Sequence, residues 1–125
     1  NTTWTKVELG TNTLDTDNAF STSSHRFTVP TGSAGWYQVF GSTGIDDIQD
    51  ADYVYARLYL NGSAVTYALG SDWGVTSNGV VQASFSYMLH LDDGDYIELY
   101  VYHQEGSTEA IEGNRCRLGG FRLNI

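Results

Sequence analysis

Apolar and polar residues alternate along this chain in short segments that end at Gly, Asn, Asp or Ser. In Tyr53–Leu60, aliphatic side chains occupy every second position and tyrosines fill most of the positions between them. Tyr96–His103 repeats the pattern, with Ile97, Leu99 and Val101 as its aliphatic set. Because successive side chains of a strand point to opposite faces, each segment is predicted to be a strand with its aliphatic face toward a core and its tyrosine face outward.

Other strands and their turns show the same signals. Strands are expected at Thr5–Leu9, Arg26–Val29, Gly35–Gly41, Ala64–Leu69, Val80–Phe85, Phe85–Leu91 and Arg117–Ile125. Asn61-Gly62 suits a type I′ hairpin turn, because both central residues of that turn need a positive φ. Asn78-Gly79 and Asp92–Asp95 are also expected turns, and Asp46–Asp52 is an expected loop. No stretch shows the 3.6-residue period of a helix, so the sequence predicts an antiparallel β-sandwich or barrel.

Length and charge narrow the class of protein. The chain has 125 residues, which suits a single domain spanning residues 1–125. Asp and Glu number 15 against six Lys and Arg, for a net charge of −9. Nucleic acid is therefore not an expected partner, since phosphate binding needs clustered positive charge, and no apolar run is long enough for membrane insertion. The start at Asn1, without Met, is expected of a processed chain or of the C-terminal part of a longer one.

Carboxylates crowd two segments and raise the question of a cation site. Asp92, Asp93 and Asp95 share one turn, and the other segment holds Asp46, Asp47, Asp50 and Asp52. Several such oxygens could hold Ca²⁺, but neither segment has the ligand positions of an EF-hand. We therefore expect no bound metal. If a cation did bind, the candidate ligands would be the carboxylates of the group from Asp46 to Asp52.

The remaining residues that could take part in catalysis or bind a metal show no catalytic pattern. His25, His90, His103 and Cys116 have no metal-ligand spacing, and the chain lacks a nucleophile elbow and a phosphate loop. A lone cysteine excludes an intrachain disulfide and is expected to be a small buried or interface residue. We therefore expect a protein that is not an enzyme and needs no cofactor.

Exposed aromatic residues are the most unusual feature. Six tyrosines are expected on the outward faces of two strands, namely Tyr53, Tyr55, Tyr59, Tyr96, Tyr100 and Tyr102. One or two would be ordinary strand formers, whereas six indicate a covered surface such as a subunit interface, a contact in an assembly or a glycan platform. Trp73 is expected in a loop, either as a ligand contact or as a plug at one end of the sandwich.

Five pieces, in order, resemble the globular domain of the C1q and tumour-necrosis-factor superfamily. They are Phe27-Thr28-Val29-Pro30, Gly35-Trp36-Tyr37, Leu58-Tyr59-Leu60-Asn61-Gly62, the run from Leu89 to Ile97 and the run from Leu118 to Leu123. The resemblance extends from about Leu14 to the end of the chain. It implies a ten-stranded antiparallel jelly-roll sandwich that forms a tight homotrimer.

The resemblance also implies where the trimer interface lies. In the resembled fold, the sheet that holds the Gly-x-Tyr strand, the strand before the Gly-Asp turn and the last strand lines the threefold axis. The residues expected there are Trp36, Gln38, Phe40, Met88, His90, Leu118 and Arg122. In the last strand, Phe121, Leu123 and Ile125 are expected to point into the core.

The short, acidic, Tyr- and Asp-rich style of the chain is similar to that of C1q-like domains in bacteriophage virion proteins. Those domains serve as tail-fibre tips, head fibres and capsid decoration. The resemblance thus implies a structural or host-attachment module on the virion surface, with neighbouring virion proteins or host-surface glycan or protein as partners. The alternative is a secreted, extracellular C1q-like recognition module that binds glycan or protein.

Overall fold

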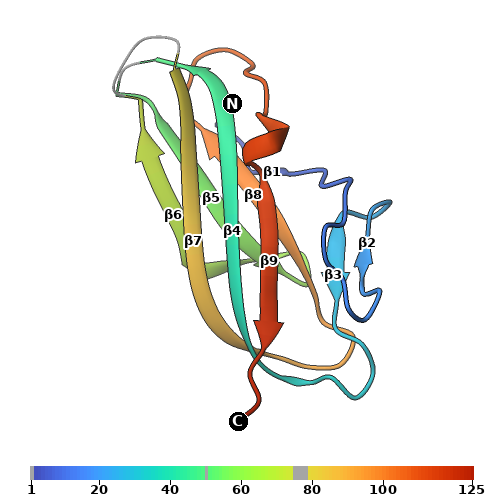
Figure 1. Ribbon diagram of the computed structural model, residues 1–125. Coiled ribbons are helices and arrows are strands. Elements are labelled where there is room, and N and C mark those ends of the chain that lie inside the picture. Colours follow the sequence, from blue (N-terminus) through green and yellow to red (C-terminus); the bar gives the residue numbers. More distant parts are fainter. Residues whose placement is uncertain (1, 50, 75–78) are drawn as a thin grey trace.

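The computed structural model describes residues 2–49, 51–74 and 79–125, which form two antiparallel sheets packed face to face (Figure 1). Sheet A has the strand order β2-β3-β8-β5-β6, with β1 also paired to β8, and sheet B has the order β7-β4-β9. The strands are β1 (Thr5–Lys6), β2 (Phe20–Ser21), β3 (Arg26–Thr28), β4 (Gly35–Ile48), β5 (Tyr53–Leu60), β6 (Ser63–Trp73), β7 (Gly79–Leu91), β8 (Tyr96–His103) and β9 (Arg117–Arg122).

The all-β jelly-roll prediction is confirmed. The described ranges contain nine strands where ten were expected, and their one short helix is the 3₁₀ turn η1 (Gly113–Arg115). Within these ranges, no helix is long and apolar enough to cross a membrane.

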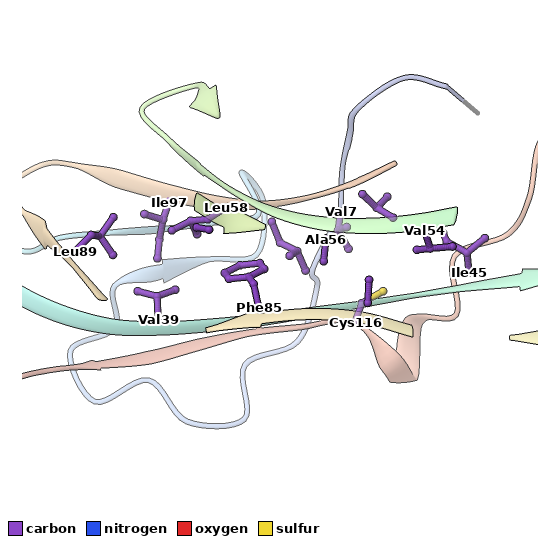
Figure 2. Packing of buried hydrophobic residues seen from close by; sticks show 14 of the residues in the cluster. Val7, Val39, Ile45, Val54, Ala56, Leu58, Phe85, Leu89, Ile97 and Cys116 are labelled. Atoms are coloured by element: carbon purple, nitrogen blue, oxygen red, sulfur yellow. The ribbon is translucent and has the colours of Figure 1, made fainter. Parts of the chain in front are cut away.

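One layer of aliphatic and aromatic side chains fills the space between the sheets (Figure 2). Leu58 of β5 and Leu99 of β8 are fully buried and lie opposite each other in the register of sheet A. Val39 of β4 and Phe85 of β7 enter the same layer from sheet B. The alternation in β5 and β8 therefore predicted the inward faces of both strands correctly.

The Asn61-Gly62 turn joins β5 to β6 as predicted. Asn61 and Gly62 have φ values of 50° and 82°, the two positive angles that a type I′ turn requires. The Asn61 side chain also donates to Asp95 Oδ1 at 2.8 Å, which links this hairpin to the turn before β8. The other predicted Asn-Gly turn begins at Asn78, which lies outside the described residues.

The predicted Asp92–Asp95 turn connects β7 to β8, and its carboxylates bind backbone. The Asp93 carboxylate accepts hydrogen bonds from the N–H groups of Gly32, Ser33 and Ala34 at 2.7, 3.0 and 2.9 Å. These bonds, the one from Gly32 foremost, hold the pKa of Asp93 below its usual 3.8. The turn thereby fixes the loop that leads into β4.

The prediction of a loop at Asp46–Asp52 was wrong in its first part. Strand β4 continues to Ile48, with an irregular register between Ile45 and Ile48 that accommodates Asp46 and Asp47. Ile45 and Ile48 are both fully buried, so the core holds the strand on each side of this bulge. Asp47 takes a positive φ of 56° there.

The predicted orientation of the last strand was also wrong. In β9, Phe121 pairs with Gln38 and is 58% exposed, whereas Leu118 pairs with Gly41 and packs against the core. Arg122 pairs with the buried Tyr37, so it does not share the outward face of Phe121. This segment has apolar residues at both alternating positions, and a period of two therefore could not fix which set points inward.

Replacing Leu99 with Ala should lower the free energy of unfolding by about 2–5 kcal/mol, because it leaves a cavity in the layer between the sheets. Chemical denaturation measures this directly. Tyr67→Ala is the matched control, since Tyr67 is 79% exposed on β6 and should lose well under 1 kcal/mol. Equal losses in both variants would contradict the assigned strand faces.

Asp93→Asn should destabilise the protein at neutral pH, because the three N–H groups lose a charged acceptor. A folded-state pKa below the ordinary value means that the carboxylate's contribution is complete above about pH 4 and is lost as the pH falls further. The gap in urea midpoint between wild type and variant should therefore narrow in acid. Asp17→Asn, at an exposed site, should show no such gap.

Candidate functional site

The tyrosine rows of β5 and β8 lie side by side on the outer face of sheet A, as predicted. Tyr55 pairs with Tyr102, and their rings meet edge to face at 5.6 Å between centroids. Tyr59 stacks on Tyr100 diagonally, at 3.7 Å and 14° between planes. Tyr53 stacks on Tyr55 at 6.0 Å. These contacts join the rings into two groups, Tyr53 with Tyr55 and Tyr102, and Tyr59 with Tyr100, within which the rings support one another.

The N-terminal segment pairs with β8 at the side of this face, and its Trp4 ring lies against the tyrosines, a contact that the sequence analysis missed. Residues Thr2–Leu9, here called the N-terminal strap, run along β8, with backbone bonds from Thr2 N to His103 O and from Val7 N to Leu99 O. Trp4 of the strap lies against Tyr102, Tyr55 and Tyr59 at 5.3, 6.2 and 6.4 Å. Most of the tyrosines are consequently half-buried, and only Tyr53 is exposed. The sequence signal that could have indicated this contact is Trp4 itself, a large apolar residue in an otherwise polar segment.

An ion cluster fastens the strap to the sheet. Glu98 occupies one of the outward positions among the tyrosines of β8 but is buried, and its Oε2 lies 3.1 Å from Lys6 Nζ and 3.3 Å from Arg26 Nη2. Lys6 also donates to Ser24 O, and the Arg26 guanidinium lies 3.9 Å from the centre of the Tyr96 ring. Burying this carboxylate is acceptable because two cations compensate it. The cluster therefore joins β1, β3 and β8 at the end of the tyrosine rows opposite Tyr53.

A depression of about 300 Å³ opens beside Trp4 on the same face. Its lining residues are Trp4, Tyr55, Leu69, Tyr102 and Gln104. Leu69 belongs to β6, where it pairs with Arg57 and so shares the outward face of β5. The Arg57 guanidinium donates to Val65 O and Thr66 O, which holds the irregular part of β6 against β5.

Trp73 was predicted in a loop but is the last residue of β6. It pairs with Tyr53, and their rings lie 6.0 Å apart. Trp73 is 52% exposed, so it extends the aromatic network to the edge of sheet A. Trp4, Tyr55, Tyr53 and Trp73 thus form a line of neighbouring rings, here called the aromatic track.

The outer face of sheet B is a second, uncovered apolar surface. Trp36, Phe40, Met88 and Phe121 are 44, 47, 52 and 58% exposed on three adjacent strands. Trp36 meets His90 edge to face at 5.7 Å, and Gln38 pairs with Met88. Phe40 lies over Gly119, where a Cβ would be 2.5 Å from its ring. Five of the seven predicted interface residues therefore share this face, while Leu118 and Arg122 do not.

The acidic residues are not gathered into a metal site in the part of the chain that is described. No group of three His, Cys, Asp or Glu side chains has metal-binding geometry there. The Asp46 carboxylate accepts the N–H of Asp47, and Asp52 lies beyond the end of β4. Asp50 lies outside the described residues. Of these carboxylates, the one of Asp46 is thus engaged by a backbone hydrogen bond and not by a shared cation site.

The histidines and the cysteine occupy separate structural positions. His25 Nδ1 contacts Leu9 O at 2.9 Å, and His90 is exposed. Burial lowers the pKa of His103, and its Nδ1 has no hydrogen-bond partner among the described residues. Cys116 is buried, its thiol contacts Glu112 O, and burial raises its pKa, which disfavours the reactive thiolate.

Comparison of the sequence with protein-family models and with curated proteins gives no match. Among solved structures, murine APRIL at pH 5.0, a member of the tumour-necrosis-factor family, is similar to this chain. The two are 15% identical, the similarity covers 79% of this chain and 73% of that chain, and the TM-score is 0.55. At this identity the likeness concerns the fold alone, and it identifies the architecture as a tumour-necrosis-factor-like jelly roll.

Proposed function

We propose that this chain is a non-enzymatic module of a bacteriophage virion that forms a homotrimer through the outer face of sheet B. The module would act as capsid decoration, a head fibre or a tail-fibre tip, in assembly or in attachment to the host. The fold and the phage-like style of the sequence support this setting by analogy. The uncovered apolar face of sheet B is the observation that carries the proposal.

Three properties of this face favour contact with further copies of the chain. Trp36, Phe40, Met88 and Phe121 expose large apolar area on adjacent strands, which a monomer in water leaves unfavourably solvated. Gln38 and His90 supply polar groups among them, so the patch has the mixed character of a subunit interface. Trimers are the usual assembly in the superfamily that the sequence resembles.

A secreted recognition module is the second candidate, favoured by the aromatic depression on sheet A. That surface lies on the opposite side of the sandwich from the proposed interface (Figure 1). A trimer built through sheet B would therefore leave Trp4, Tyr55 and Tyr102 accessible to a ligand. Host attachment by a fibre tip would combine both roles.

Sedimentation at micromolar concentration should give three times the chain mass. Phe40→Asp should give a folded monomer, because a charge on the proposed interface costs several kcal/mol of association while the site is exposed in a single chain. Tyr67→Asp, on exposed β6, is the control and should remain trimeric. A wild-type protein that stays monomeric at this concentration would contradict the proposed trimer.

Antibodies against the folded protein should label purified virus particles in electron micrographs. Labelling on the capsid or at fibre tips would assign its place on the virion. The secreted candidate predicts the protein free in the medium and no labelled particles. That result would overturn the virion proposal and leave the trimer untouched.

A further inference from the structure

We infer that the depression beside Trp4 binds one ring of a neutral oligosaccharide. This gives a ligand class to the attachment role, and in that respect it rests on the proposed function. Ligand pockets usually begin at about 300 Å³, so the size of this depression suits one small ring rather than a large ligand. Four of its five lining residues are aromatic or aliphatic, and the fifth is Gln104.

The aromatic walls suit the face of a sugar ring. Trp4 is tilted by 40° against Tyr102 and by 59° against Tyr55, so the three lining rings lie at angles to one another rather than in one plane. Leu69 of β6 closes the opposite side and is 40% exposed. One face of a pyranose is made of C–H groups, which pack on the electron-rich faces of aromatic rings.

The polar groups at the rim suit the hydroxyls around that ring. Gln104 offers an amide donor and acceptor, and Tyr55 and Tyr102 each offer a hydroxyl. Within the described part of the chain, none of these three side chains has a hydrogen-bond partner. A ligand with donors and acceptors around an apolar face would engage them, whereas a purely apolar ligand would leave them unpaired.

Charge favours a neutral sugar over an acidic one. None of the five lining residues is charged, and the chain carries a net charge of −9. The guanidinium of Arg57 lies 5.6 Å from the Trp4 ring, but it already donates to two carbonyls of β6. An acidic sugar would therefore find no counter-charge here and would be repelled by the protein as a whole.

The aromatic track extends the subsite along the sheet. Tyr53 stacks on Tyr55, Trp73 lies against Tyr53, and both outer rings are exposed. A second sugar unit leaving the depression on the β6 side would pass over them. Longer oligosaccharides should consequently bind more tightly than single sugars.

Fluorine NMR of the trimer labelled with 5-fluorotryptophan tests the inference, because it gives a separate signal for each of the three tryptophans. The probes are maltotriose, cellotriose, chitotriose and mannotriose, with 3′-sialyllactose as the acidic probe. At least one neutral trisaccharide should shift the Trp4 signal saturably and leave Trp36 unmoved. Tyr102→Ala and Gln104→Ala should each weaken binding about tenfold, and Tyr67→Ala should not.

Three outcomes with the sugar probes overturn the inference. They are a Trp4 signal unmoved by every neutral probe, an equal response to 3′-sialyllactose, and an unchanged affinity in a folded Tyr102→Ala variant. A shift produced only by casein peptides would identify a polypeptide groove instead and would equally overturn it. If antibodies against the protein label virus particles and the trimer binds none of the sugars, only this inference is contradicted and the proposed function stands. A sugar-binding monomer absent from particles contradicts the proposed function alone.

Discussion

The single layer of side chains between the two sheets is the constraint on which the rest of the structure depends. Leu58 and Leu99 enter it from sheet A, and Val39 and Phe85 enter it from sheet B. A strand can give this layer only every second residue, so the residues between must point outward. In β5 and β8 those residues are largely tyrosines, and in β4 they include Trp36 and Phe40. Both outward aromatic surfaces therefore follow from the same registers that build the core.

The two surfaces differ in how their apolar area is satisfied. On sheet A, the rings pack on one another and on Trp4, and the buried Glu98 fastens the strap that carries Trp4. On sheet B, Phe40 lies over Gly119 and Met88 pairs with Gln38, and both remain about half exposed. The apolar area on sheet A is thus largely buried by contacts within the chain, and only a small depression stays open. The apolar area on sheet B remains available for association.

Sequence alone was sufficient where apolar residues occupied one alternating set of positions, as in β5 and β8. It failed in β9, where Leu118 and Phe121 sit at opposite parities and either could have faced the core. Trp4 and the burial of Glu98 were missed because the partners are far apart in the chain: Lys6 and Glu98 are separated by 92 positions. A local pattern predicts which face of a strand points inward, but it does not predict which distant segment packs against the outward face.

The strap also has a consequence for how the protein comes to its final form. Its pairing with β8 closes a loop that contains most of the chain, and contacts of such separation cost loop-closure entropy and form slowly. During synthesis from the N-terminus, Trp4 is made long before β8. Its ring and the tyrosine rings of β5 therefore stay exposed to solvent until β8 has been synthesised. The aromatic surface of sheet A is therefore completed only after β8 has been made and the N-terminal strap has paired with it.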